Sequence, residues 1–141
     1  MRLNHSLVPM IDYHKAKRLI WDPREDSIFY HDLPNALMRL LTDTSHAAQA
    51  EAGCVYHVMI EGVLAETGYY GFGQALRARS LLPGLLRGIE LVQRDEARHI
   101  AYGVYLLQRL IAGEPALWES VTARMNDLLP KAMGVIGDVS Q

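Results

Sequence analysis

A long proline-free stretch from Ser45 to Arg79 carries a regular helical spacing. Along it, small, apolar and a few polar residues recur at alternating intervals of three and four, which is the period of one face of an α-helix. The residues on this face are Ala47, Ala50, Cys54, His57, Glu61, Leu64, Gly68, Gly71 and Ala75. Ser45 is typical of a helix N-cap. The pattern therefore predicts one long helix over residues 45–79.

The same spacing returns in a second long helix after a break at Arg79 and Ser80. Pro83 fits the first turn of a helix, and Gly113 is typical of a C-terminal end. One face between them holds Leu85, Ile89, Val92, Glu96, His99, Gly103, Leu106 and Leu110. The short break predicts an antiparallel hairpin over residues 45–112, in which these two faces meet and are buried.

The rest of the sequence predicts shorter elements around this hairpin. Pro34 lies in the first turn of a brief helix that ends before Thr42. A third, amphipathic helix opens at Pro115 and is predicted to end at Pro130. Residues 1–31 are predicted to be an irregular lead-in. No strand alternation is found in the sequence, so the expected class is all-α, with 1–141 as a single domain.

Composition narrows the functional classes. The net charge of -2, with acids and bases interspersed, gives no basic stripe, so nucleic acid is not expected as a partner. Acidic residues such as Glu61 and Glu90 interrupt the apolar runs, which excludes a membrane span. The single cysteine, Cys54, cannot form an internal disulfide, and the first residues are not typical of a signal peptide, so we expect a cytoplasmic protein.

Glu96 and His99 are polar residues on a face that is predicted to be buried, which indicates a functional site. They are three apart and share the predicted buried face of the second helix. A buried carboxylate costs several kcal/mol unless a counter-charge meets it. Glu61 lies on the facing helix. Because the midpoint between residues 61 and 96 falls at the break, the hairpin places Glu61 opposite Glu96. One Glu and one Glu-x-x-His are half of the ligand set of ferritin-like dinuclear sites, and such donors favour iron or manganese over thiolate zinc.

Other polar residues near this face have plainer interpretations. His57 is one turn before Glu61 and either contacts the site or satisfies a neighbouring carbonyl group, the second being favoured. Tyr56 is offset from Glu61 by about 140° on an ideal α-helix and is either a core aromatic or a redox residue. Cys54 is interpreted as a small apolar filler. Asp43 and His46 have ligand-like spacing but straddle a helix start, where capping is favoured.

Two segments carry a resemblance to a known family: YHVMIEGVLAETGY at 56–69 and RDEARHIAYG at 94–103. The chain resembles the ribonucleotide-reductase small-subunit-like ligand-binding oxidases of the ferritin-like superfamily, over about residues 28–112. The resemblance implies a dinuclear Mn/Fe or Fe/Fe centre that activates dioxygen beside a long-chain fatty-acid-like ligand, a place in lipid metabolism, and a homodimer.

The resemblance also implies roles for individual residues. Glu61, Glu96 and His99 correspond to metal ligands, and Tyr56 to a tyrosine that becomes ether-linked to a valine. Asp95 and Tyr69 correspond to hydrogen-bonding residues behind the ligands.

One departure from the family is large. The family supplies another carboxylate and a second Glu-x-x-His from earlier helices, and this sequence has no second Glu-x-x-His. The chain therefore looks like a C-terminal half of a partial ferritin-like bundle. A truncated gene model, a split protein and a decayed remnant are the explanations, with truncation favoured. Two copies of the chain would together present the ligand count of a full site.

Three functions follow from these patterns. The leading hypothesis is an oxidase with a dinuclear metal centre. An alternative is a ribonucleoside-diphosphate reductase small subunit, which would need a radical tyrosine and a docking tail. A third is a metal-free helical module that oligomerises through uncovered apolar faces.

Overall fold

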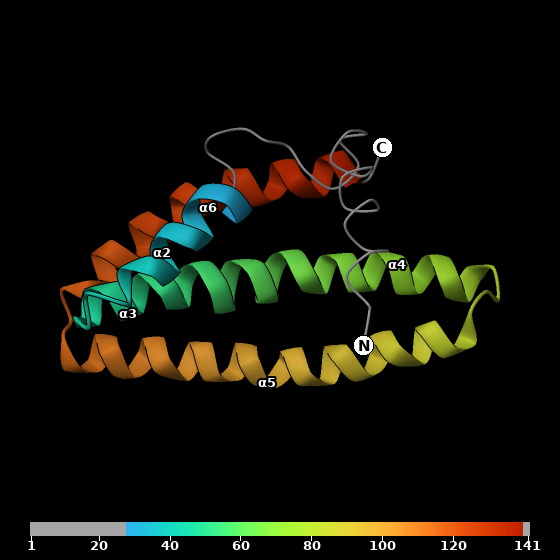
Figure 1. Cartoon of the computed structure of the whole chain (residues 1–141), viewed down its shortest axis with the longest axis horizontal. Coiled ribbons are helices and arrows are strands. Elements are labelled where there is room, and N and C mark those ends of the chain that lie inside the picture. Colours follow the sequence, from blue (N-terminus) through green and yellow to red (C-terminus); the bar gives the residue numbers. More distant parts are fainter. Residues whose placement is uncertain (1–27, 140–141) are drawn as a thin grey trace, which may run out of the picture.

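The computed structural model of the chain describes residues 28–139, and every regular element in this range is a helix (Figure 1). The all-α class is thereby confirmed for the described residues. The elements are η1 (Ile28–Asp32), α2 (Leu33–Arg39), α3 (His46–Gly53), η2 (Cys54–Ala65), α4 (Glu66–Ala78), α5 (Pro83–Gly113) and α6 (Leu117–Val139), where η marks a π-helix.

The predicted long helix is present as α3, η2 and α4 running end to end (Figure 1). Its start is capped as expected, because the Ser45 side chain accepts a hydrogen bond from the Ala48 N–H at 3.2 Å. Its middle differs from the prediction. The segment η2 is wider than an α-helix, since π-helices form hydrogen bonds to the fifth residue along rather than the fourth. Such segments are frequent at functional sites.

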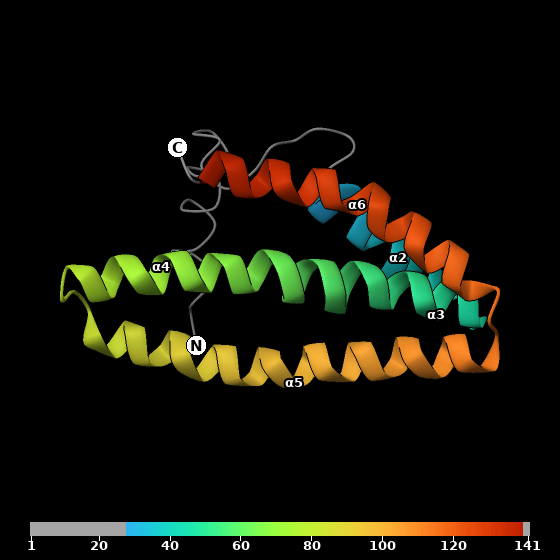
Figure 2. The ribbon, with the colours of Figure 1, turned by 180° about the vertical axis from the view of Figure 1, so that it is seen from behind.

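The hairpin is antiparallel, as predicted, and α5 lies alongside α3, η2 and α4 over their whole length (Figures 1 and 2). The turn uses two residues with left-handed backbone, Ser80 with φ 52° and Leu82 with φ 46°. Pro83 then opens α5 in its first turn. This tight reversal places residues of η2 opposite residues of α5.

The helices α2 and α6 cover the side of η2 that faces away from α5 (Figures 1 and 2). Apolar side chains of η1, α2, α3 and α6 form a core with those of η2: Ile28, Ala36, Ala52, Val55, Met59, Leu64, Leu128 and Ala132. A second, smaller cluster joins the N-terminal part of the long helix to the C-terminal end of α5 and the first residue of α6: Ala50, Cys54, Leu107, Leu110 and Leu117. The segment η2 is therefore enclosed from both sides.

Two predictions at the edges of the fold are wrong. Pro130 does not end the last helix, because α6 continues through it to Val139. Proline removes the hydrogen bond to the carbonyl group four residues earlier and its ring crowds that carbonyl group, but the burial of Leu128 and Ala132 on either side favours continuation of the helix. Residues 28–31, assigned to an irregular lead-in, belong to η1, and Ile28 is buried.

The remainder of that lead-in, 1–27, lies outside the described residues. The single-domain assignment stays a prediction. Among the described helices, none combines the length and apolar character required to cross a membrane.

Candidate metal centre

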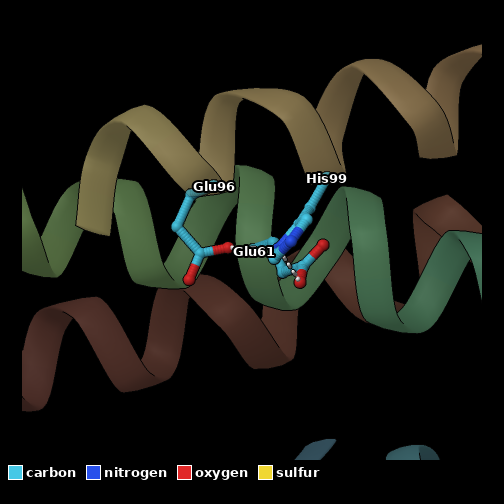
Figure 3. A group of neighbouring side chains, drawn as sticks. All are labelled: Glu61, Glu96 and His99. Atoms are coloured by element: carbon cyan, nitrogen blue, oxygen red, sulfur yellow. Dashed lines mark hydrogen bonds and ion pairs between the residues drawn. The ribbon is translucent and has the colours of Figure 1, made fainter. Parts of the chain in front are cut away.

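The side chains of Glu61, Glu96 and His99 converge between η2 and α5 (Figure 3). One donor atom from each lies within 4.8 Å of the others. Glu61 comes from η2 and is 4% exposed, whereas Glu96 and His99 come from one face of α5. The helical period and the centred hairpin turn bring them together, as the sequence predicts.

The imidazole of His99 lies between the two carboxylates. Its Nδ1 is 3.3 Å from Glu61 Oε1 and 3.3 Å from Glu96 Oε2. One imidazole is thus shared by two carboxylates, of which Glu61 is buried and Glu96 partly buried. A divalent cation is the counter-charge that such a group lacks.

The face of α5 that carries these residues is less buried than predicted. His99 has a side chain that is 54% exposed, and Leu85 and Val92 on the same face are also exposed. In the described part of the chain, α5 packs mainly along one partner, the long helix, with brief contacts to α6. A single packed helix covers only part of the surface of α5. The three converging side chains are therefore covered on the side of η2 and exposed to solvent on the side of His99.

Tyr56 lies closer to Glu61 than the sequence indicated. On an α-helix residues five apart point in different directions, but in η2 the hydrogen bonds join residues five apart and bring their side chains together. Burial raises the pKa of Tyr56 above its usual value, and the neighbouring carboxylates of Glu61 and Glu96 raise it further. The wide helix therefore places a phenol beside the carboxylates.

Tyr69 approaches the same group from α4. Its hydroxyl donates to Glu96 Oε1 at 3.5 Å. Burial and then the Glu96 carboxylate raise the pKa of Tyr69. This contact is the one expected of a residue that orients a ligand from behind, and the role itself stays a prediction.

His57 contacts the group, so the favoured interpretation of this histidine was wrong. Its Nδ1 lies 2.7 Å from Glu61 Oε2, and not against a neighbouring carbonyl group. The spacing of four from Glu61 was the signal in the sequence, since residues four apart are neighbours on a helix.

Asp95 is not brought to the three converging residues in this chain. Its carboxylate accepts from Arg98 at 2.6 Å on the exposed surface of α5. Its assignment as a hydrogen-bonding acid behind a ligand stays a prediction.

The plainer interpretations of Cys54 and Asp43 agree with the structure. Cys54 is fully buried, and burial raises the pKa of its thiol to about 11, so it packs as an apolar side chain. Asp43 Oδ1 accepts from the Ser45 N–H at 2.9 Å, next to the helix cap. His46 instead faces Glu114, with 3.3 Å between His46 Nδ1 and Glu114 Oε2. Asp43 and His46 therefore do not form a ligand pair.

Comparison with known proteins gives a consistent answer. No protein-family model matches the chain. A solved structure of an R2-like ligand-binding oxidase without metal cofactor is 40% identical, with a TM-score of 0.78 over 80% of this chain and 42% of that chain. This chain is a relative of the R2-like ligand-binding oxidases. The resemblance read from residues 56–69 and 94–103 is thereby confirmed.

Two further R2-like ligand-binding oxidase structures are variants with metals. One, with an anaerobically reconstituted Mn/Fe cofactor, is 36% identical, with a TM-score of 0.83 over 93% of this chain and 49% of that chain. Another, with an aerobically reconstituted Fe/Fe cofactor, is 38% identical, with a TM-score of 0.79 over 84% of this chain and 42% of that chain. The chain spans under half the length of each of these oxidases.

The chemistry of the converging side chains fits the metals of those oxidases. Carboxylate oxygens with one imidazole nitrogen suit iron or manganese. No cysteine belongs to the group, so it does not have the donors of a structural zinc site. Burial, and after it the neighbouring carboxylates, raise the pKa values of Tyr56 and Tyr69, so both phenols remain protonated beside the carboxylates at neutral pH.

Proposed function

We propose that the chain supplies half of the ligands of a dinuclear carboxylate metal centre with oxidase activity, holding Mn/Fe or Fe/Fe. The observation that carries the proposal is the convergence of Glu61, Glu96 and His99 within 4.8 Å. The kinship with R2-like ligand-binding oxidases supports it over a ribonucleoside-diphosphate reductase small subunit. The ions, when bound, would supply the activation of dioxygen.

The chain's own residues would hold and orient that centre. Glu61 and Glu96 would bind through their carboxylates and His99 through its imidazole, from two helices packed side by side. The Tyr69 hydroxyl would restrict the rotation of the Glu96 carboxylate through its hydrogen bond. Tyr56 would be the oxidisable or ether-linked tyrosine, and Glu61 beside it would accept its proton.

We also propose, as the resemblance implies, a long-chain fatty-acid-like ligand and a place in lipid metabolism. The related R2-like oxidases are named for ligand binding. A cavity of about 390 Å³ lies between α2, α3 and α6, and none of the three converging residues lines it. The proposed fatty-acid site is instead the open side of His99, whose side chain is 54% exposed.

A homodimer is the proposed assembly, because aromatic side chains are exposed on α5 near the centre. Tyr102 and Tyr105 are both more than half exposed, and exposed apolar patches mark association surfaces. A second copy would bring further carboxylates and another imidazole. The cytoplasmic location stays a prediction.

Metal analysis of the purified chain tests the proposed function. Protein expressed with iron and manganese is expected to retain metal, and Glu96→Ala is expected to lose it. Glu90→Ala is the matched control, since Glu90 lies on the same helix but pairs with Arg77 and Arg87. Retention of under about 0.1 ion per chain in the wild type would refute a metal centre in this chain and leave the metal-free oligomerisation module as its function.

A further inference from the structure

His57 stands out because it lies four residues before Glu61 on the same helix and makes a short contact with its carboxylate. Its side chain is mostly buried, and its Nδ1 is 2.7 Å from Glu61 Oε2. A metal ligand must be an ionised carboxylate, which can only accept, so in a metal-binding Glu61 the donor would be His57 Nδ1. The other oxygen of Glu61, Oε1, faces His99. The two oxygens are thus divided between an imidazole of η2 and an imidazole of α5.

The ring of His57 is held in place by the opposing helix. A Cβ atom added to Gly103 would lie 2.2 Å from His57 Cβ and 2.8 Å from its Cγ. Any side chain at 103 would therefore force the two helices apart at this level. Tyr102 meets the ring edge-on with 5.5 Å between the centroids, and Tyr56 lies 5.0 Å from it. The glycine and the two aromatic rings leave the imidazole little freedom.

We propose that His57, seated against Gly103, is a positioning residue that fixes the Glu61 carboxylate so that Oε1 points to the metal. The inference rests on the proposed function. A carboxylate held at one oxygen loses less freedom when the other oxygen binds an ion, because its orientation is already set. Partners that orient metal ligands in this way are typically worth about 10- to 100-fold in affinity.

Binding of Mn(II) to the purified chain, followed by competition with a chromophoric chelator, tests the role of His57. His57→Leu keeps an apolar side chain but removes the donor, and its Mn(II) dissociation constant is expected to rise about 10- to 100-fold. His57→Asn keeps an N–H donor at the position of Nδ1 and is expected to bind within about threefold of wild type. A packing role alone predicts no rescue by asparagine.

Two controls separate the possible failures. His46→Leu removes another histidine that faces a carboxylate, far along the helix, and is expected to leave Mn(II) affinity unchanged. Urea unfolding of the metal-free His57 variants is expected to show similar stability for leucine and asparagine.

If wild type binds Mn(II) and His57→Leu binds equally well, the positioning role is overturned while the metal centre stands. If wild type binds no better than Glu96→Ala, the metal centre itself is refuted, and this inference with it.

Discussion

Two buried carboxylates in this molecule have opposite surroundings. Asp32, 2% exposed, is met by two cations of α6: Arg124 Nη2 lies 2.9 Å and Lys131 Nζ 3.1 Å from its oxygens. Glu61, almost as buried, is met by imidazoles and lies near a second carboxylate, Glu96. The Asp32 group is balanced, because an arginine and a lysine of the same chain meet it. The Glu61 group is unbalanced in the sense that, among the described residues, no arginine or lysine forms an ion pair with Glu61 or Glu96.

The difference separates a structural group from a binding group. A buried carboxylate with its own cations ties the beginning of the described chain to its last helix, and it needs nothing from solution. A carboxylate pair without a cation gains its counter-charge only from a ligand. Burial alone does not distinguish these cases, and the sign of the neighbouring charges does.

The largest effect is expected at the balanced group. Arg124→Met removes the cation that lies closest to Asp32 and leaves this buried carboxylate with Lys131 and with the exposed His31, whose Nδ1 is 3.7 Å away. Breaking one partner of a buried ion pair is strongly destabilising, so we expect a loss of about 3 kcal/mol in the free energy of unfolding. Urea unfolding monitored by circular dichroism measures it.

Arg98→Met is the control for that substitution. Arg98 also pairs with an aspartate, Asp95, at 2.6 Å, but both side chains are exposed. Exposed pairs contribute little, so its expected loss is within about 0.5 kcal/mol. Equal losses in the two variants would show that burial does not set the value of the Asp32 group.

A smaller effect of opposite sign is expected at the unbalanced group. Glu61→Gln removes one of two neighbouring negative charges and keeps an amide oxygen that accepts from His57. In EDTA at pH 8, the free energy of unfolding should rise by up to about 1 kcal/mol, because an amide costs less to bury than a carboxylate that no arginine or lysine meets. Chemical unfolding of the metal-free protein is the measurement. A loss of similar size would mean that the chain already balances Glu61.

The smallest effect is expected at an exposed carboxylate, Asp43. The hydroxyl and N–H of Ser45, then Arg39, lower the pKa of Asp43 from 3.8 to about 2. A pKa lowered in the folded state gives stability that is present above pH 3.8 and is lost as the pH falls toward 2. Urea midpoints at pH 4 and pH 2.5 should therefore fall less in Asp43→Asn than in wild type. Parallel declines in the two proteins would contradict this assignment.

The sequence predicts the unbalanced group better than the balanced one. Glu96 and His99 are related by the helical period, and Glu61 by the position of the hairpin break, so short-range rules place them together. Asp32 and Arg124 are far apart in the sequence, and no period links them. Their pairing depends on how α6 lies across η2, which follows from the packing of the whole core.

The same limit explains the errors about Pro130 and Tyr56. Proline predicts a helix end from local hydrogen bonding, whereas the burial of Leu128 and Ala132 decides the continuation of α6. The angle between Tyr56 and Glu61 was taken from an α-helix, and the sequence gives no periodic signal for the π-helix that changes it. The exposure of His99 was likewise not predictable, because it depends on which helices lie beside α5.

The π-helix η2 has a consequence for changes of chain length. It sets the rotational phase between α3, which is anchored to α2 and α6, and the part of the long helix that carries Glu61. Deleting one residue from η2, with the winding on either side of the deletion kept, would turn everything after the deletion by roughly a quarter of a turn. Glu61 would then face away from α5 while Cys54 kept its place. This segment can therefore accept exchanges of side chains more readily than the gain or loss of a single residue.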